Sequence, residues 1–366
     1  MKILWMTWKD RSNPRAGGAE LVNEEIAKRL TRDGHEVIFL VASFTGNTLS
    51  EECRDGFKII RLGNSYTVYW KAYQYYKKNL QGWADRVIDE VNTIPFFAPW
   101  YVKEPVVLFV HQLCREIWFY QMRFPLNFIG YLAEPIYLYL LRRQRVITVS
   151  ESTKKDLLHS GFLSENIEII PEAIETEPVK ALQDSKSAVE QIVLSLGSFR
   201  SMKRTHHQIE AFEIAKQSLP ELRMKIAGDG SDSYGKRIRK MIQKSRYSKD
   251  IEHYGRVGDI QKIELLQASS LLLVTSVKEG WGLVVTEANS QGTPAIVYDV
   301  DGLRDSVRHN ETGIITQKNS PESLAESIVL LLSDPNRHAR IRHNAWEWSK
   351  TFNFEKTCRS FLIILR

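Results

Sequence analysis

Short apolar runs alternate with longer amphipathic stretches along most of the chain. In the first half the apolar runs predict strands, and the stretch 19–32, with helical spacing and a glycine after it, predicts a helix. The expected strands lie at 2–7, 36–42, 57–62, 86–91, 106–111, 145–150 and 167–170. The pattern begins again at residue 192, with strands expected at 192–197, 222–227, 271–275 and 295–298 and helices at 206–218, 260–268 and 283–290.

Strands that alternate with helices form parallel sheets with helices on both faces, so the pattern predicts an α/β chain of two Rossmann-like domains. We expect the first domain to span 1–171 and the second 172–352, with a connection near 171–187. A final helix at 353–365 has an apolar stripe and is expected to rejoin the first domain, as part of 353–366. Each open sheet offers a ligand crevice at the carboxyl ends of its strands.

Composition excludes several classes of protein. The 366 residues are 43% hydrophobic and 26% charged, which is typical of a globular chain. Three distant cysteines without a C-x-x-C spacing argue against a disulfide framework or a cysteine zinc site. A net charge of +6 without a basic recognition module argues against nucleic acid as a partner. With neither a signal peptide nor a long apolar run, we expect a cytoplasmic protein.

The segment 70–145 is unusually rich in Trp, Tyr and Phe, and it ends in a helix-like stretch at 126–141 followed by three arginines. One interpretation is an aromatic core with a basic helix end. The other is an interfacial surface with rings at the level of lipid headgroups and arginines on anionic lipid. The second interpretation would place the protein peripherally at the inner face of the membrane.

The strongest chemical signal is the run from Glu279 to Glu287, which follows a buried strand and opens a helix. Its two carboxylates, eight residues apart, flank a Gly-x-Gly turn, and glycines there allow the backbone and the first helix amides to approach a ligand. Glu279 at the strand end could accept hydrogen bonds from sugar hydroxyls, and Glu287 from a pair of ribose hydroxyls. A plain strand–turn–helix with surface glutamates has the same spacing.

The run from Glu279 to Pro294 resembles the E-x7-E signature of the family 4 retaining glycosyltransferases, with Trp281 in place of the usual Phe. Other motifs of that family have counterparts at 17–20, 149–157, 169–171, 254–257 and 352–354. The resemblance implies the GT-B fold, in which two Rossmann-like domains face each other across a cleft. It also implies an enzyme of bacterial cell-envelope or exopolysaccharide synthesis.

Carried over by position, the resemblance implies catalytic roles for Glu279, His111 and Lys203, with no metal ion and no other cofactor. The implied donor-binding residues are Gly17, Gly18, Ser198, Arg200, Lys203, Arg256, Val257, Gly280, Trp281, Gly282, Leu283 and Glu287. Two positions depart from the family pattern. Ser198 stands where the family has Arg, so that Arg200 would have to supply the guanidinium, and Glu172-Ala173 follows Pro171 in place of Asn-Gly, which changes a contact or hinge there.

These features predict a retaining, metal-independent hexosyltransferase. The family resemblance implies UDP-glucose or another UDP-hexose as the donor, and a saccharide or a lipid-linked saccharide as the acceptor. Fixed cations and helix amides would stabilise the charge that develops on the leaving diphosphate. The alternative is a non-catalytic nucleotide-sugar-binding or scaffold protein of the same fold. A nicotinamide-dependent oxidoreductase is disfavoured, because the first loop has only Gly17-Gly18 and no G-x-G-x-x-G.

Overall fold

The computed structural model describes residues 1–47, 49–182 and 191–366. It divides into two compact units, which are treated separately below. Unit 1 comprises residues 1–173 together with 353–366, and unit 2 comprises 174–352. The boundary expected between 171 and 172 lies two residues before this division, and residues 183–187 of the expected connection lie outside the described residues.

Unit 1 is built on an eight-stranded sheet with the order β3-β4-β2-β1-β5-β6-β7-β8. Every neighbouring pair is parallel except β3 with β4, which form an antiparallel hairpin at one edge. The strands are β1 (Lys2–Met6), β2 (Glu36–Val41), β3 (Glu51–Arg54), β4 (Phe57–Arg61), β5 (Arg86–Glu90), β6 (Val106–Val110), β7 (Arg145–Thr148) and β8 (Ile167–Ile169).

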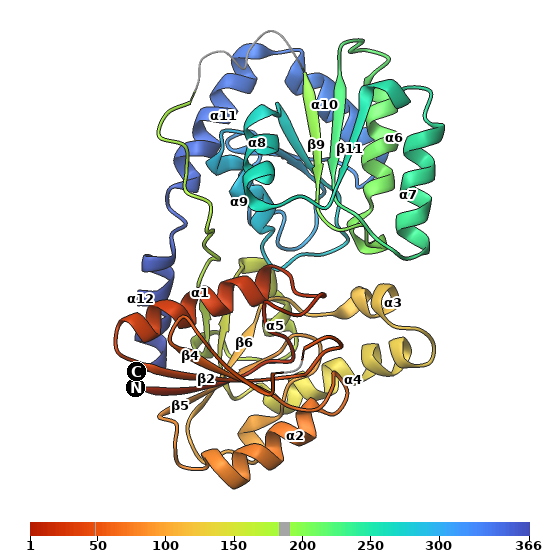
Figure 1. Cartoon of the computed structure of the whole chain (residues 1–366). Coiled ribbons are helices and arrows are strands. Elements are labelled where there is room, and N and C mark those ends of the chain that lie inside the picture. Colours follow the sequence, from red (N-terminus) through yellow and green to blue (C-terminus); the bar gives the residue numbers. More distant parts are fainter. Residues whose placement is uncertain (48, 183–190) are drawn as a thin grey trace. The chain divides into compact units, whose positions relative to one another are not determined.

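The two faces of this sheet are covered by different helices (Figure 1). On one face α2 packs over Leu4 and Val87, and α4 packs over Leu108. On the other face lie α1 and α12, whose Phe361 stacks on Trp5 with ring centroids 5.4 Å apart. The helices are α1 (Gly18–Arg32), α2 (Val68–Tyr75), η1 (Tyr76–Leu80), η2 (Ala98–Trp100), η3 (Arg115–Ile117), α3 (Trp118–Gln121), α4 (Leu126–Leu141), α5 (Glu151–His159), η4 (Ser164–Asn166) and α12 (Phe354–Leu365).

Unit 2 is built on a six-stranded, fully parallel sheet with the order β11-β10-β9-β12-β13-β14. The strands are β9 (Ile192–Leu196), β10 (Arg223–Ala227), β11 (Ile251–Gly255), β12 (Leu271–Val274), β13 (Ala295–Val297) and β14 (Gly313–Ile315). The side chains of β12 and β13 are all apolar and buried, as expected for inner parallel strands covered on both faces, whereas the edge strand β11 is largely polar and partly exposed.

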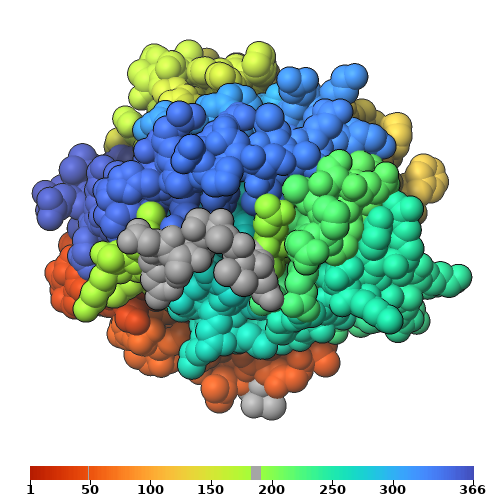
Figure 2. All heavy atoms as spheres, turned by 90° about the horizontal axis from the view of Figure 1, so that it is seen from above, coloured from red at the N-terminus to blue at the C-terminus, as the bar shows by residue number. Residues whose placement is uncertain are grey.

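Helices cover both faces of the second sheet. The α6 and α10 helices lie side by side on one face, and the space-filling view in Figure 2 looks onto this unit. The α9 helix packs against β12 and β13. The helices of unit 2 are η6 (Ser201–Lys203), α6 (Thr205–Ala215), α7 (Ser233–Lys244), η7 (Ser248–Asp250), α8 (Asp259–Ala268), α9 (Leu283–Ser290), α10 (Pro321–Leu332) and α11 (Pro335–Ser349).

Each unit therefore has the predicted Rossmann-like architecture. In both sheets the strand order reverses near the middle, beside β1 in unit 1 and beside β9 in unit 2. Ligands of open α/β sheets bind at the carboxyl ends of the strands at such points. No helix among the described residues is both long enough and apolar enough to cross a lipid bilayer.

Candidate active site

The run from Glu279 to Glu287 has the strand–turn–helix structure that its sequence predicts. It follows β12, and α9 begins at Leu283. Gly282 has a φ of 99°, which glycine adopts readily, and a Cβ there would lie only 2.9 Å from the side chain of Leu303. The Val285 amide donates to the Gly282 oxygen at 2.8 Å, and the two amides before it, at the start of α9, have no acceptor within the helix and can donate to a ligand.

Glu279 and Lys203 are directly paired. The Lys203 ammonium and the hydroxyl of Ser276 both donate to Oε1 of Glu279. Lys203 ends η6, just after β9, and Glu279 follows β12, so the neighbouring positions of β9 and β12 bring the two side chains together. Both remain partly exposed, at 32% and 16% of their side-chain surfaces.

A small cavity of about 30 Å³ lies at the carboxyl ends of β9 and β12. Its lining combines backbone, hydroxyl and cationic groups, which suit a phosphate or a polar ligand. The lining residues include Gly197, Ser198, Lys203, Thr275, Ser276 and Val284. The cavity thus brings together Lys203 and Ser198, two of the residues expected at the donor.

Two of the expected cations lie in the open. Arg200 is exposed on the loop after β9, and Arg256 is exposed on the loop after β11. The neighbour of Arg256, Val257, is half-buried and packs against the apolar cluster beneath β12. The structure does not gather either arginine into the cavity lined by Lys203.

Glu287 lies in the middle of α9, with 14% of its side chain exposed, and its Oε1 accepts a hydrogen bond from Lys262 at 3.0 Å. Burial raises the pKa of the Glu287 carboxyl, against the opposing effect of the Lys262 ammonium. Lys262 belongs to α8. The sequence does not predict its pairing with Glu287, because nothing in the residues around Lys262 marks it as a partner of that carboxylate.

Trp281 points into unit 2 and leaves only its backbone for a ligand. Its ring is 6% exposed and packs against Phe352, and the indole N–H donates to the hydroxyl of Thr286 at 3.0 Å. The aromatic residue of the signature is thus a packing residue that holds the Gly280–Gly282 turn in place.

The loop that carries Glu279 is braced by a second pair of carboxylates. Asp299 and Asp301 form an Asp-x-Asp run after β13, a spacing that can suit a divalent cation. Lys278 donates to Asp301 at 2.6 Å, and Arg304 pairs with both aspartates. Burial acts to raise the pKa of the Asp301 carboxyl, but the Lys278 and Arg304 cations hold this pKa below its ordinary value. The Glu279 amide donates to the backbone oxygen of Asp301 at 3.1 Å, so the run supports the Glu279 loop.

In unit 1, His111 lies at the end of β6 within a buried polar cluster. Its Nδ1 is 2.6 Å from Oε1 of Glu172, and its Nε2 is 3.3 Å from Oδ1 of Asn23 and 3.9 Å from Oε1 of Glu90. The Asn23 amide also donates to Oε2 of Glu90 at 2.6 Å. Glu172 belongs to one of the two positions that depart from the family pattern, and the structure shows that its carboxylate contacts His111.

The charge balance of this cluster favours a protonated His111. Burial alone would lower the pKa of the imidazole, but the carboxylates of Glu172 and Glu90 raise it above its ordinary value. Burial also raises the pKa of Glu90. Within the described part of the chain, Oε1 of Glu90 and Oε1 of Gln112 are buried and accept no hydrogen bond.

The glycine loop of unit 1 is exposed, and α1 begins at Gly18. The Gly17 amide donates to Oε2 of Glu20 at 2.6 Å, while Oε1 of Glu20 pairs with Lys9 at 2.9 Å. Glu20 thus ties the glycine loop to the segment after β1.

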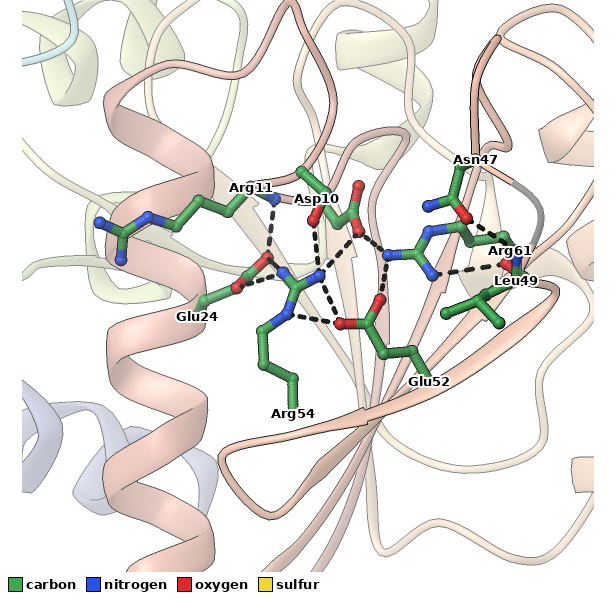
Figure 3. Close-up of polar contacts among 9 residues, drawn as sticks. Asp10, Arg11, Glu24, Asn47, Leu49, Glu52, Arg54 and Arg61 are labelled. Atoms are coloured by element: carbon green, nitrogen blue, oxygen red, sulfur yellow. Dashed lines mark hydrogen bonds and ion pairs between the residues drawn. The ribbon is translucent and has the colours of Figure 1, made fainter. Parts of the chain in front are cut away.

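A largely buried ionic network holds Asp10, the residue after Lys9 in the same segment (Figure 3). Arg61, at the end of β4, pairs with Asp10 and with Glu52, and its side chain is 0% exposed. Arg54 pairs with Glu24 of α1 at 2.9 Å and with Glu52 at 2.7 Å. The network joins the β3–β4 hairpin to the loop that leads to Gly17 and Gly18.

Comparisons with known proteins identify the class to which this fold belongs. The computed structure matches sucrose-phosphate synthase of Thermosynechococcus elongatus with a TM-score of 0.79, at 20% identity, over 98% of this chain and 97% of that one. It matches Anabaena HepE in complex with UDP-glucose with a TM-score of 0.76, at 20% identity, over 100% and 99% of the two chains. The protein therefore has the GT-B fold of glycosyltransferases.

Family models then place the chain within that class. The model described as Glycosyltransferase Family 4 matches residues 16–178, and the model described as Glycosyl transferases group 1 matches 179–348. The chain belongs to the family 4 glycosyltransferases.

Two relatives illustrate how far the similarity extends. An uncharacterised glycosyltransferase of Haemophilus influenzae is 23% identical over 96% of both chains. An exopolysaccharide phosphotransferase of Streptomyces coelicolor is 30% identical over 65% of this chain, and the match spans only 25% of that longer protein.

Proposed function

We propose that the protein transfers a hexosyl group from a UDP-sugar, with UDP-glucose the first candidate, to a hydroxyl of a saccharide or lipid-linked acceptor, with retention of anomeric configuration. The observation that carries the proposal is the Lys203–Glu279–Ser276 group. It lies beside a cavity at the ends of β9 and β12 and next to the opening of α9. This group offers a cation, hydrogen-bond acceptors and helix amides at one place in unit 2.

Different residues would bind the sugar, the diphosphate and the ribose of the donor. Glu279 would accept hydrogen bonds from sugar hydroxyls, and Lys203, released from Glu279, would bind the diphosphate. Glu287 would accept hydrogen bonds from the two ribose hydroxyls, with Lys262 keeping its carboxylate in place. The structure of HepE with UDP-glucose supports UDP-glucose as the first donor to test.

The proposed reaction needs no nucleophile from the protein. The bond between the anomeric carbon and the β-phosphate oxygen breaks, and the acceptor oxygen forms a bond with that carbon on the same face. The departing phosphate takes the acceptor proton. Lys203 and the amides that open α9 would stabilise the negative charge that grows on the diphosphate.

We place the acceptor near the polar cluster of unit 1 that contains His111. His111 would donate from this cluster. The name of the Streptomyces coelicolor relative supports a role in polysaccharide synthesis, and we extend this to the bacterial cell envelope. We also propose a metal-independent reaction on the cytoplasmic side, since Lys278 and Arg304 already neutralise the Asp-x-Asp run.

The test measures thermal stabilisation of the full chain by UDP, GDP, ADP and their common sugars, with EDTA present. We expect one nucleotide series to stabilise the protein, and we expect Glu287→Gln to remove most of that stabilisation. Glu264→Gln, an exposed change on α8, is the matched control. Stabilisation by no nucleotide, or equal stabilisation of the Glu287→Gln variant, would contradict the donor assignment.

Turnover separates the enzyme from a non-catalytic nucleotide-sugar-binding protein of the same fold. The enzyme should release UDP from UDP-glucose, and Lys203→Met should lower kcat by roughly 100-fold or more, since it removes a charge aimed at the leaving group. NMR of a glycosylated product should show the anomeric configuration of the donor. Binding without any turnover would favour the non-catalytic alternative, and an inverted product would overturn the proposed mechanism.

A further inference from the structure

The α4 helix of unit 1 is apolar on the side that faces the sheet and also on the side that faces solvent. Its inner side packs Tyr137, Leu138 and Leu141 against the sheet. Its outer side leaves large apolar side chains about half exposed or more: Leu126, Phe128, Ile129, Leu132, Ile136, Tyr139 and Leu140, at 49–63%. Phe124, just before the helix, is 82% exposed. We call this outer side, from Phe124 to Leu140, the α4 face.

The α4 face carries no charge. The one ionisable acid or base within α4, Glu134, is turned inward and is 1% exposed. Its carboxylate accepts hydrogen bonds from the amides of Cys114 and Arg115 at 2.7 Å each and from the indole of Trp118 at 3.0 Å. An exposed patch of this kind, without a charged residue, is typical of an interaction surface rather than a solvated helix face.

The borders of the α4 face are cationic. Residues 115–145 contain five arginines (Arg115, Arg123, Arg142, Arg143 and Arg145) and two acids, Glu116 and the buried Glu134. The guanidinium of Arg142 lies 3.6 Å from the ring centroid of Tyr139, and that of Arg115 lies 4.5 Å from Tyr131. Tyrosines and arginines thus surround an aliphatic and phenylalanine centre, which is the arrangement that proteins use at the headgroup level of a bilayer.

Charge complementarity indicates which kind of partner binds to the α4 face. A second copy of this chain would bring the same arginine-bordered face against the first and would set like charges together. An anionic lipid surface offers acyl chains to the apolar centre and phosphates to the arginines. The 16 residues of α4 span only about 24 Å, less than the roughly 30 Å of a hydrocarbon core, so the helix would lie along the surface.

We infer that the α4 face docks on the anionic, cytoplasmic surface of a lipid bilayer, with Phe128, Leu132 and Ile136 inserted below the headgroups and the bordering arginines on lipid phosphates. This inference goes beyond the proposed transfer reaction and rests on unit 1 alone. It assigns the two interpretations of the aromatic segment 70–145 to different residues of that segment. Tyr76 and Trp118 belong to the core, and the α4 face is the interface.

The test is flotation of the full chain with vesicles of phosphatidylcholine alone and of phosphatidylcholine with phosphatidylglycerol. We expect binding to the mixed vesicles, weakening as salt is raised. The double variant Leu132→Ser/Ile136→Ser should reduce binding about tenfold or more, because both side chains would otherwise leave water for the acyl region. The matched control is Leu330→Ser/Ile363→Ser, which removes two apolar side chains that are 55% and 65% exposed elsewhere.

A charge variant provides the second comparison. Arg123→Gln/Arg143→Gln should weaken binding to the mixed vesicles several-fold and change binding to phosphatidylcholine little. Failure of the unaltered chain to float, or equal flotation of the Leu132→Ser/Ile136→Ser variant, would overturn the inference. A dimer that this variant converts to a monomer, with no vesicle binding, would make the face an interface between copies.

UDP-induced thermal stabilisation of the same samples keeps this inference separate from the proposed function. The Leu132→Ser/Ile136→Ser variant should lose vesicle binding and keep its response to the nucleotide. A chain that floats but responds to no nucleotide would leave the docking inference standing and remove the donor assignment.

Discussion

Single residues decide the charge state of the candidate sites, and Glu172 is the clearest case. The sequence marks it as a departure from the family pattern, and the structure places its carboxylate 2.6 Å from Nδ1 of His111. A carboxylate at this distance fixes the ring orientation and stabilises the imidazolium form. We therefore regard Glu172 as a positioning residue for His111.

Glu172→Gln should lower the pKa of His111 and make the protein less stable, more so at low pH. Neighbouring carboxylates raise the folded-state pKa of His111 above its ordinary 6.5. The interaction of His111 with Glu172 therefore stabilises the folded protein fully below about pH 6.5. This stabilisation is lost as the pH rises through the raised pKa of His111. At pH 6 the Glu172→Gln variant should lose roughly 1–2 kcal/mol more of its free energy of unfolding than it loses at pH 9.

NMR titration of the imidazole and urea denaturation at both pH values would measure these two effects. Glu165→Gln, an exposed change nearby, should alter neither quantity. A destabilisation by Glu172→Gln that is the same at pH 6 and pH 9 would mean that the pair has no ionic component.

UDP affinity should depend on pH through Glu287. Burial raises the pKa of this carboxyl, so it becomes protonated at a higher pH than an exposed glutamate does. The protonated form accepts ribose hydroxyls poorly, and Kd for UDP should therefore rise severalfold as the pH falls from 7 towards 5. Calorimetric titration at several pH values would measure this change, and Glu287→Gln should bind more weakly but with a flatter profile. An equally steep profile in that variant would assign the pH dependence to another group.

At the scale of elements, the sequence predicts best where a turn residue marks an end. The α9 helix matches its predicted bounds, because Gly282 precedes it and Gly292-Thr293 follows it. Lys203 and Glu279 could also be expected together, since both follow central strands of one sheet. The Lys262–Glu287 pair could not be predicted, because it depends on how α8 packs beside α9, which no local pattern records.

Some elements absent from the prediction carried a weak signal and others a clear one. The β3 strand (Glu51–Arg54) is short, polar and at an edge, so its signal is weak. The α7 helix (Ser233–Lys244) carries a clear one, because Tyr234, Ile238 and Ile242 recur at helical spacing and are buried. The function of β3 is nevertheless structural and specific. Through Glu52 and Arg54 it supplies part of the ionic network that anchors the segment before the glycine loop.

Arg61→Met should destabilise unit 1 by about 3–5 kcal/mol, because it leaves the buried carboxylate of Asp10 without its main cationic partner. Urea denaturation would measure the loss, with the half-exposed Lys58→Met on the same strand as control. Adding Asp10→Asn and Glu52→Gln should recover part of the stability. A loss below about 1 kcal/mol would show that the network relaxes around a missing arginine.

At the scale of the whole molecule, each unit has its own hydrophobic core, but unit 1 is made from two stretches of the chain that lie on either side of unit 2 in the sequence. Unit 1 contains α12, which comes after the whole of unit 2 in the sequence. Phe361 of α12 is fully buried between Trp5 and Phe109, with ring centroids 5.4 and 5.6 Å away. The return of 353–366 to the first domain could be expected from the apolar stripe together with the family resemblance.

Phe361→Ala should destabilise unit 1 by about 3–5 kcal/mol and leave unit 2 nearly unchanged, because the cavity would open in the first core only. Hydrogen exchange would locate the effect. Protection should fall in β1 and β6 and persist in β9 and β12. Ile363→Ala on the same helix, at an exposed position, serves as the control. Loss of protection in both units alike would show that they unfold as one.

The place of α12 in the chain also sets an order of events during synthesis. A ribosome releases all of residues 174–352 before it releases Phe354 to Leu365, so unit 2 can complete its core first. Until the last helix emerges, Trp5 and Phe109 lack the ring that covers them. The usual rule that the N-terminal domain matures first is thus reversed here, and the nascent first unit is the one that needs protection from aggregation.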